Sequence, residues 1–579
     1  FGSSGSGSMV PAPPPRALAG RGRRRGAMRP PWATSRAISC ILAVGFCERA
    51  CHLALRAAQG PWLQEHGLSP SQASALSQAF AILSCAAGLL GGRLADARLG
   101  RHRAIGLFAG SLFAGCLACA VAAVPSLECV QVYILGAFGF AVLGSGGVRP
   151  SVVAFGAEQL NPSAAESEST LEAYFIYSYV AVNVACLLPY APLPSLAAAG
   201  LPHLVPTEEG FFATCMAVAS LMLLGLLAYA WGGPSYRSEG LVHESRLNEL
   251  WGRMAPKSAV FGWACVPLLT FAAVFAALLD HPGLRLVSLI LCASCGLGLG
   301  LGRRLPGVEG SNGEPSVLDC VPALLAGNFS LGILTDNVYG LFFADCLWAA
   351  QDPRSAVAFR LERPPLHLIA PLVATAAAPL LRRVGPLAPH VRACAGLVLA
   401  VAAQVSAVFA APKLMGPGGA REGCLPLLVQ DAPSDHTAAG GRGGAWLAVS
   451  FAMLGAAEVL VCPALQQLAF TEAPPQWRSS MQAFGFFAAG ALSQAVSSAW
   501  REAEWSQEGR SRLPADFVAN VAAGVAAAVL FARASCSCCK CWSGLREAVQ
   551  PDAVAVATPG SRRSAEEANP STPNNGDSE

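Results

Sequence analysis

Acidic and basic residues inside apolar stretches of this chain are the residues best placed to do chemistry. In the first such stretch, positions 45–49 read Gly-Phe-Cys-Glu-Arg, so that Glu48 and Arg49 are neighbours near its middle. A charged side chain inside an apolar helix is costly and usually faces a water-filled pathway. The two residues are either a structural ion pair that stabilises a helix bundle or an anion site built around the arginine.

Two further charges lie in later apolar stretches. Arg149 follows a run of small residues at positions 144–147 and precedes Pro150. Small residues allow helices to pack closely, and a proline kinks a helix. Arg149 is therefore a second candidate anion site. Glu458 is a lone carboxylate close to Cys462 and Pro463, where it could hold a proton or a cation.

A short basic turn at positions 92–103 joins the second and third apolar stretches. Its acid can cap a helix, and its arginines can anchor at anionic lipid. By its residues alone, the turn is either a gating element or a signal for membrane orientation. The residues that we single out in it are Gly92, Asp96, Gly100, Arg101 and Arg103.

The composition indicates what kind of fold positions these residues. Of 579 residues, 13% are charged and 53% are hydrophobic, whereas about 25% of a soluble domain is charged. Too few polar residues remain to cover a water-exposed surface, so we predict an all-α polytopic membrane protein. The net charge of +3 argues against nucleic acid as a partner. The 21 cysteines lie mostly in apolar runs without framework spacing, which argues against a disulfide-stapled secreted fold.

The apolar segments suggest about fourteen membrane-spanning helices, because each crossing needs roughly 20 apolar residues. We expect six helices, an inserted hairpin of two, and six more. The expected spans are 37–58, 71–92, 104–124, 131–156, 171–191, 210–232, 258–279, 283–302, 317–348, 366–381, 391–411, 445–470, 479–500 and 515–534. The expected organisation is a disordered basic tail (1–36), a six-helix bundle (37–232), a linker with the hairpin (233–304), a second six-helix bundle (316–534) and a disordered cytosolic tail (535–579). Whether the hairpin spans the bilayer stays open.

Basic residues near short loops predict the orientation, because they favour the cytoplasmic side. The N-terminal tail and the turn at 92–103 are rich in arginine and are predicted to be cytoplasmic, as are both termini. Plasma membrane and acidic organelle both stay open. Just past the last span lies a group of juxtamembrane cysteines, which are either S-acylation sites or inert. These lipidation candidates are Cys536, Cys538, Cys539 and Cys541.

Several stretches together resemble the proton-coupled oligopeptide transporter family of the major facilitator superfamily. Glu48 and Arg49 look like the end of its Glu-x-x-Glu-Arg motif, and residues 92–103 resemble the superfamily's loop between helices two and three. Residues 146–150 and 155–159 are similar to the family's fourth-helix signature. The remaining matches are 179–183 to helix five, 368–371 to helix eight, and 458–463 with 473–478 to helix ten and its following loop. The chain is identified as a divergent member over about 37–534.

The resemblance implies a major facilitator fold, in which two six-helix bundles rock around a central cavity. The inserted hairpin is similar to the two extra helices of prokaryotic members. By this resemblance, Arg49 and Arg149 hold a peptide carboxylate, a pairing that a low dielectric favours. Glu458 and Asn183 then meet the peptide's amino end, and Tyr179, from the same motif as Asn183, belongs to the substrate site.

The resemblance also implies that Glu48 carries or relays the coupling proton, and Glu458 is a further candidate for proton coupling by its residue type. The sequence departs from the family around Glu48. Gly45 stands where the family has the first glutamate of its motif, so one proton site is missing. His52 lies one turn further on, in place of an aromatic residue. It could titrate in place of the lost acid, since an imidazole changes charge near neutral pH. A plain packed histidine is the alternative.

The expected function is a proton-coupled symporter of di- or tripeptides or peptide-like amino acids, working by alternating access. A non-transporting membrane receptor or scaffold is an alternative. The departures that favour it are Gly45, Leu53 in place of an aromatic residue, and Gly485 in place of a tryptophan on helix eleven. A carrier of another small anion is a further alternative. We expect no enzyme, because no constellation of catalytic or metal-ligating side chains lies at one depth. We also expect no cofactor or metal. The expected partners are the lipid bilayer, protons and the small substrate, and the expected state is a monomer.

Overall fold

The computed structural model describes residues 35–160, 167–190, 192–201, 203–237, 321–347, 368–384, 387–414, 437–473, 475–497 and 515–549. Over these ranges the regular secondary structure is helical, apart from one β-bridge between Leu201 and Val205. Nine helices in these ranges are long and apolar enough to cross a membrane. The prediction of an all-α polytopic membrane protein is therefore confirmed. The expected hairpin at 258–302 and the chain ends 1–34 and 550–579 lie outside the described residues. Residues 535–549, expected to belong to a disordered tail, are helical instead.

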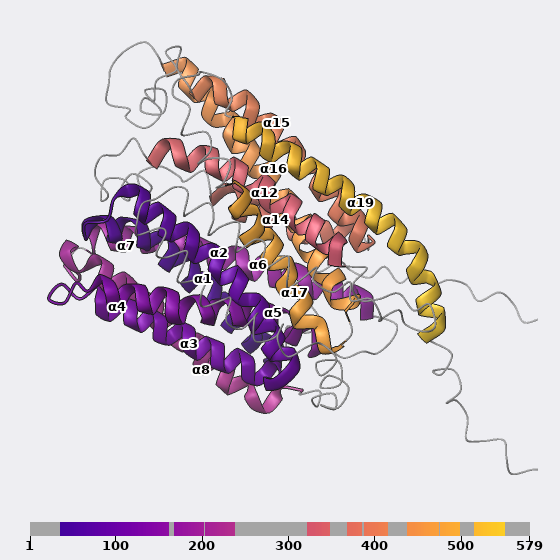
Figure 1. Ribbon diagram of the computed structural model, residues 1–579, viewed down its shortest axis with the longest axis horizontal. Helices are drawn as coiled ribbons and strands as arrows, with labels where there is room; N and C mark the ends of the chain where they lie inside the picture. The colour runs from indigo at the N-terminus through magenta and orange to yellow at the C-terminus, as the bar shows by residue number, and fades with distance from the viewer. Residues whose placement is uncertain are drawn as a thin grey trace, which may run out of the picture.

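The helices form two groups, which lie side by side along their length (Figure 1). The first group contains α1 (Arg36–Glu65), α2 (Pro70–Leu94), α3 (Arg101–Ala122), α4 (Val130–Ile134), α5 (Val142–Glu158), α6 (Ser167–Tyr190), α7 (Pro192–Ala199) and α8 (Gly210–Gly232). A π-helical stretch, Leu135–Ala141, joins α4 to α5, and another, Ala95–Leu99, extends α2. The Leu135–Ala141 stretch thus merges α4 and α5 into one membrane-length crossing, Val130–Glu158.

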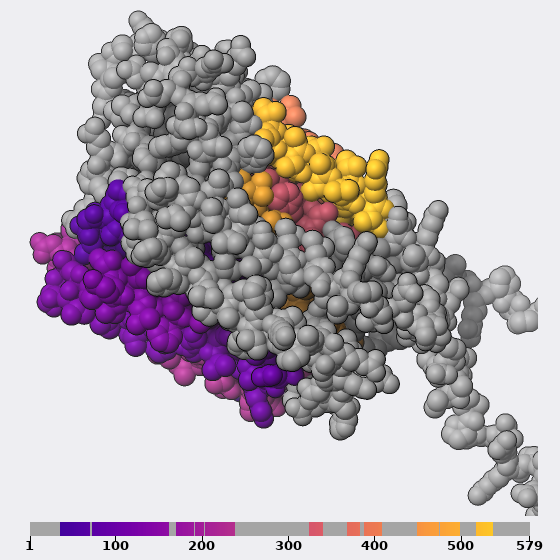
Figure 2. All heavy atoms as spheres, viewed as in Figure 1, coloured from indigo at the N-terminus to yellow at the C-terminus, as the bar shows by residue number. Residues whose placement is uncertain are grey.

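The second group comes from the C-terminal half of the chain. It contains α12 (Val321–Leu347), α14 (Ile369–Val384), α15 (Pro389–Leu414), α16 (Thr437–Thr471), α17 (Arg478–Phe486) and α19 (Ala515–Val549). Helix α17 continues through the π-helical stretch Phe487–Leu492 and helical residues up to 497. Helix α19 lies on the outside of this group (Figure 2).

Helix α1 illustrates how the sequence sets the length of these elements. It has 30 residues, against the expected 22 apolar positions of 37–58, and it runs past Pro61 to Glu65. At about 1.5 Å per residue it is about 45 Å long, more than the roughly 30 Å of a bilayer core. Helix α2 follows closely, because Ser69 and Gln72 form a capping box and Pro70 occupies the first turn. The ends of α1 therefore extend beyond the apolar layer.

Each group has its own apolar core. Phe80, Leu112 and Met222 are fully buried in the first, and Leu334 and Phe451 are fully buried in the second. Large apolar side chains also face outward, with exposed fractions of 59% at Leu107, 61% at Leu224, 70% at Val398 and 59% at Leu530. An outward apolar surface of this kind is suited to lipid contact.

Glycines bring the backbones of α2 and α5 into direct contact. A Cβ atom on Gly91 would lie 2.3 Å from the Cα atom of Gly147. The run of small residues on α5 therefore permits close packing, as its composition predicted. Arg149 lies two positions after Gly147, so this close contact also sets the position of its backbone relative to α2.

The two groups meet along helices that carry the candidate residues. Helix α6 of the first group packs against α14 and α16, and α17 of the second packs against α2 and α5. Charged and polar side chains gather where these faces enclose a cavity.

Candidate functional site

The site is a cavity of about 300 Å³ between the two groups of helices. Helices α1, α2, α5 and α6 line it on one side, and α12, α16 and α17 with its continuation line it on the other. The charged residues in its wall are Glu48, Arg49, Arg56, Arg149, Asp336 and Glu458. All three arginines belong to the first group, whereas Asp336 and Glu458 belong to the second. The cavity therefore has a mainly cationic wall opposite an anionic one.

Glu48 forms an ion pair across the first group. Its Oε1 atom lies 3.0 Å from Nε of Arg149, and the side chains are only 3% and 12% exposed. The partner of Glu48 is thus Arg149 on α5 rather than its neighbour in sequence, Arg49. Successive residues of a helix point about 100° apart, so two neighbours cannot face one partner. A structural ion pair does exist at this position, and it includes one of the candidate anion-binding arginines.

Ser145 connects this ion pair to His52. Its hydroxyl donates a short hydrogen bond to Glu48 Oε1, and it lies 3.2 Å from both His52 Nδ1 and Arg149 Nη2. His52 is 3% exposed and stacks on Phe80, with ring centroids 5.0 Å apart. The histidine is therefore packed and also hydrogen-bonded to the residue that contacts the Glu48 carboxylate.

The second and third arginines of the wall come from α1. Arg49 lines the cavity, as the sequence suggested, and so does Arg56, which sequence reasoning missed. Arg56 follows Arg49 by seven residues and His52 by four, and residues at these spacings share one face of a helix. This spacing is the signal that could have found Arg56.

Tyr179 and Glu458 connect the two groups at the cavity. The Tyr179 hydroxyl on α6 donates to Oε2 of Glu458 on α16 at 2.8 Å, so two residues expected in the substrate site do meet. Asn183 lies one turn further along α6 and is 4% exposed. Its amide donates to the Tyr179 carbonyl oxygen at 2.9 Å, and it is not among the described residues that line the cavity.

The opposite wall carries further polar groups. Asp336 on α12 accepts a hydrogen bond from the Ser493 hydroxyl at 2.9 Å. Thr335 Oγ1, Gln466 Oε1 and Gln494 Oε1 are buried atoms without a hydrogen-bond partner in the described part of the chain. All three residues line the cavity. A bound molecule would therefore meet hydrogen-bonding groups as well as charges on this side.

Neighbouring side chains pack closely against two of the departures from the family motifs. A Cβ atom on Gly45 would lie 2.9 Å from Cγ1 of Val152, so a side chain there requires Val152 to shift. A Cβ atom on Gly485 would lie 3.1 Å from Nδ2 of Asn328. Both glycines line the cavity. Pro364, which stands where the family has an asparagine on its eighth helix, lies outside the described residues.

The basic turn of the sequence forms a cluster that joins the groups at one end of the cavity. We call Asp96, Arg101, Glu158, Arg478, Ser479 and Ser480 the latch. Asp96 Oδ2 accepts hydrogen bonds from the backbone N–H of Ser480 at 2.7 Å and from its hydroxyl at 2.9 Å. Its Oδ1 accepts from the Ser479 N–H at 3.3 Å. Asp96 therefore caps the first turn of α17, where a negative charge is favoured.

Arginines complete the latch. Arg101 Nη2 lies 2.8 Å from Asp96 Oδ1, and Arg101 also pairs with Glu158 and donates to the Pro475 carbonyl. Arg478 Nη1 lies 3.2 Å from Glu158 Oε1. Glu158 on α5 thus holds arginines from both groups of helices.

The glycines of this turn permit the geometry. A Cβ atom on Gly92 would lie 2.8 Å from the Ser479 carbonyl oxygen, so the chain approaches α17 closely there. Gly100 has φ of +75°, a conformation that other residues rarely adopt. Arg103 is exposed.

A second ion pair joins the groups between α6 and α15. Arg392 Nη1 lies 3.0 Å from Glu172 Oε1, and Arg392 Nη2 donates to Gln467 Oε1 at 2.6 Å. The Arg392 side chain is 1% exposed. Removing one partner of so deeply buried an ion pair would leave an uncompensated charge.

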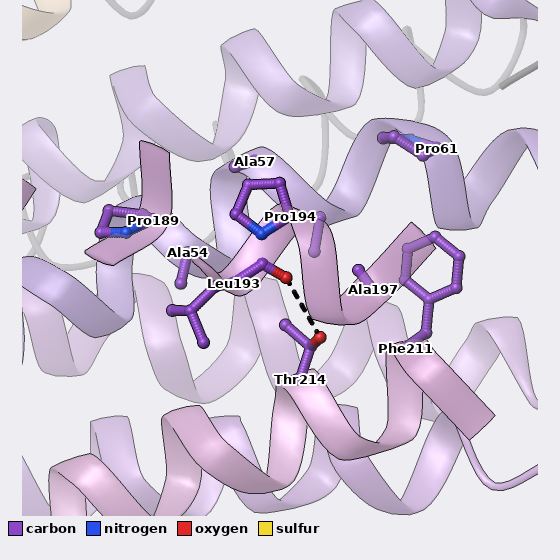
Figure 3. A pocket seen from close by; sticks show the side chains of 10 residues that line it. Ala54, Ala57, Pro61, Pro189, Leu193, Pro194, Ala197, Phe211 and Thr214 are labelled. Carbon is purple, nitrogen blue, oxygen red and sulfur yellow. Dashed lines mark hydrogen bonds between the residues drawn. The ribbon is translucent and has the colours of Figure 1, made fainter. Parts of the chain in front are cut away.

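A small hollow and a group of cysteines lie apart from this site. A hollow of about 10 Å³ between α1, α6, α7 and α8 is lined mainly by alanine and proline, and its polar group, the Thr214 hydroxyl, bonds to the Leu193 carbonyl (Figure 3). The four candidate lipidation cysteines lie in the last part of α19, where the structure describes the backbone alone. Their acylation stays a prediction. No metal-binding group of side chains occurs among the described residues.

Comparisons with known proteins find similarity over part of the chain. Residues 102–255 match the family model of the POT family. Peptide transporter family 1 of Drosophila melanogaster is 26% identical over 214 residues, which are 36% of this chain and 28% of that protein. Solute carrier family 15 member 2 of Rattus norvegicus is 27% identical over 209 residues, which are 34% of this chain and 27% of that protein. The matched segment thus spans less than a third of either relative.

Solved structures match over most of the chain. A crystal structure of the peptide transporter POT in complex with sulfate has a TM-score of 0.54 at 18% identity, covering 87% of this chain and 95% of that one. A POT family transporter in complex with a thioalcohol-conjugated peptide has a TM-score of 0.56 at 15% identity, covering 87% and 96%. At these identities the likeness shows a shared fold, which confirms the predicted fold class.

Proposed function

We propose that this chain, which is a divergent member of the POT family, is a proton-coupled symporter of di- or tripeptides or peptide-like amino acids. The observation that carries the proposal is the charge distribution of the cavity. Arginines face it from α1 and α5, and the carboxylates Asp336 and Glu458 face it from α12 and α16. A zwitterionic molecule that spans the cavity meets an opposite charge at each end. The relatives and structures that the chain matches are transporters and not enzymes.

The size of the cavity limits the substrate. A volume of about 300 Å³ is at the lower end of the usual range for ligand pockets, roughly 300–1,000 Å³. A short peptide or an amino-acid derivative fits this volume, whereas a long peptide does not. We assign Arg49 and Arg149 to the substrate carboxylate and Glu458 with Tyr179 to its amino end. Asn183 acts through Tyr179, whose carbonyl it contacts.

The ion pair between Glu48 and Arg149 provides a way to link proton and substrate. While Glu48 is ionised, it holds Arg149 at 3.0 Å. A proton on Glu48 removes the charge that attracts Arg149, so the guanidinium becomes available to a substrate carboxylate. Proton binding and substrate binding then favour each other, as symport requires.

Alternating access needs a gate at each end of the cavity. The latch connects α2, α3 and α5 of the first group to α17 of the second. The many arginines of the 92–103 turn and of the N-terminal tail favour the cytoplasm for both, and we place the latch there. With the latch formed, the cavity is closed on the cytoplasmic side. The latch must break for the substrate to leave inward.

Transport into proteoliposomes tests this function. Purified protein is reconstituted, and uptake of radiolabelled dialanine is measured with and without an inwardly directed proton gradient. The proposal expects accumulation that depends on the gradient and is lost in Glu48→Gln. Equal uptake with and without the gradient would identify an uncoupled carrier, and absence of both uptake and binding would remove peptides as substrates.

A carrier of another small anion is the second candidate. The observation that favours it is the positive wall formed by Arg49, Arg56 and Arg149, together with the loss of an acid at Gly45. Uptake of labelled nitrate by the same proteoliposomes, with no uptake of dialanine, would support this candidate. Failure of both probes would favour a receptor or scaffold. The monomeric state and the choice of membrane remain predictions.

A further inference from the structure

We propose that the Ser145 hydroxyl relays a proton from His52 to Glu48 and is the link through which the cavity loads its coupling site. The inference rests on the proposed function, since it says how the symporter's proton reaches Glu48. Its basis is the contact of one buried hydroxyl with an imidazole, a carboxylate and a guanidinium.

The hydrogen-bonding capacity of these groups fixes the direction of each bond. A guanidinium only donates and a carboxylate only accepts, whereas a hydroxyl donates once and accepts twice. Ser145 is fully buried, and its O–H donates to Glu48 Oε1 while it accepts from Arg149 Nη2. Its remaining lone pair faces His52 Nδ1 at 3.2 Å. The proton of a neutral His52 is therefore assigned to Nδ1, and Nε2 is left as an acceptor.

The surroundings of His52 favour passing a proton on. Phe80 of α2 stacks on the ring, and the charges that act on it are Arg49 and Arg56 of α1 and Arg149 of α5. Cys85 of α2 is a further titratable group in the same part of the wall, 4.0 Å from Arg149. Positive charges repel a proton that arrives on His52, whereas Glu48 attracts it. His52 lines the cavity, so it is placed to receive the proton from there.

The relay step is balanced. A hydronium ion in the cavity transfers a proton to Nε2 of His52 and is left as water. The Nδ1–H bond of His52 then breaks as that proton passes to the Ser145 oxygen. The original O–H bond of Ser145 breaks at the same time, and its proton bonds to Oε1 of Glu48. His52 ends as the other neutral tautomer and Ser145 is unchanged. Glu48 ends as a neutral carboxylic acid, which weakens its hold on Arg149.

Two transport assays on the same proteoliposomes separate the relay from the carrier itself. Gradient-driven accumulation of dialanine needs net proton movement, whereas exchange of labelled for unlabelled dialanine at equal pH does not. The test variants are Ser145→Ala and His52→Gln, because glutamine can hydrogen-bond but cannot carry a proton. The matched control is Ser151→Ala, which removes another buried hydroxyl of α5 that bonds to the Gly147 carbonyl at 2.9 Å.

We expect both test variants to retain exchange and to lose gradient-driven accumulation about tenfold or more, as when a proton-transfer group is removed. Ser151→Ala should keep both activities. Wild-type accumulation in Ser145→Ala would overturn the relay and leave the proposed function standing. Loss of exchange in both test variants would also overturn it, because the residues would then be needed for the fold or for binding. A wild-type protein that neither exchanges nor accumulates dialanine would refute the proposed function, and the relay with it.

Discussion

Glu48 and Arg149 form an ion pair in the wall of the cavity. A substitution at Arg149 is therefore expected to affect both substrate binding and the stability of the fold. Arg149→Ala removes a candidate carboxylate ligand and also leaves Glu48 buried beside no matching charge at 3.0 Å. Breaking a buried ion pair from one side costs about 3–5 kcal/mol. A loss of transport in this variant therefore does not by itself identify a substrate contact.

We predict that Arg149→Ala lowers the thermal unfolding midpoint in detergent more than the double variant Glu48→Gln/Arg149→Ala does. The double variant removes the stranded charge together with its partner. Arg149→Lys serves as the control, since it keeps the charge and should lie close to the wild type. Equal midpoints for the single and double Arg149→Ala variants would show that the ion pair contributes nothing to stability.

Gly45 is a second position at which a single substitution tests the packing of the cavity wall. We predict that Gly45→Glu does not restore the family's proton site but destabilises the protein by about 1–3 kcal/mol, as overpacking of a filled core does. The reason is Val152, whose Cγ1 would lie 2.9 Å from the new Cβ atom. Adding Val152→Ala should recover part of the loss. Thermal midpoints of the two variants provide the measurement, and a fully stable Gly45→Glu would contradict the packing argument.

At the scale of elements, α17 depends on a side chain from the other half of the chain. Its first turn has two N–H groups that Asp96 caps, at distances of 2.7 and 3.3 Å. We predict that Asp96→Asn destabilises the protein by about 1–2 kcal/mol, because the cap loses its charge at the helix N-terminus and its ion pair with Arg101.

The thermal unfolding midpoint checks this prediction. Ser480→Ala is the matched control, because it removes only the hydroxyl contact at 2.9 Å and leaves the backbone cap in place. Its midpoint should fall by less than that of Asp96→Asn. The reverse order would mean that the hydroxyl, and not the capped backbone, carries the contact.

At the scale of the whole molecule, the two groups of helices are joined at the latch and by the ion pair between Arg392 and Glu172. We predict that Glu158→Gln loosens the latch end, because Glu158 pairs with both Arg101 and Arg478. Hydrogen exchange should become faster in the first turns of α17 and in α2 near Asp96.

The control for this measurement is Glu208→Gln, an exposed acid ahead of α8. It should leave exchange in α17 unchanged. Unchanged exchange in Glu158→Gln would mean that the backbone cap alone holds the groups together. In that case the arginines of the latch would contribute to orientation in the membrane rather than to closure.

The sequence by itself determined the class of the molecule and the identity of most charged residues at its centre. Thirteen per cent charge over a mostly apolar chain leaves membrane helices as the structure that satisfies the backbone. Charged residues in such helices are costly and usually face a water-filled pathway. On this ground the sequence predicted four of the charged residues that line the cavity, namely Glu48, Arg49, Arg149 and Glu458. The helical periodicity alone could also have predicted Arg56 as a cavity residue, since it follows Arg49 by seven residues and residues at this spacing share a helix face.

Only the tertiary structure decided which of these residues meet. Glu48 pairs with Arg149, 101 positions away, and Asp96 caps a helix 384 positions away. The spacing of residues along a helix fixes the face on which each lies, but not which face of which other helix is packed against it. That choice comes from the packing of glycines such as Gly91 and Gly147, which sets the distance and register between helices. The ion pairs follow from this packing, because a buried charge takes its partner from whichever helix is brought close.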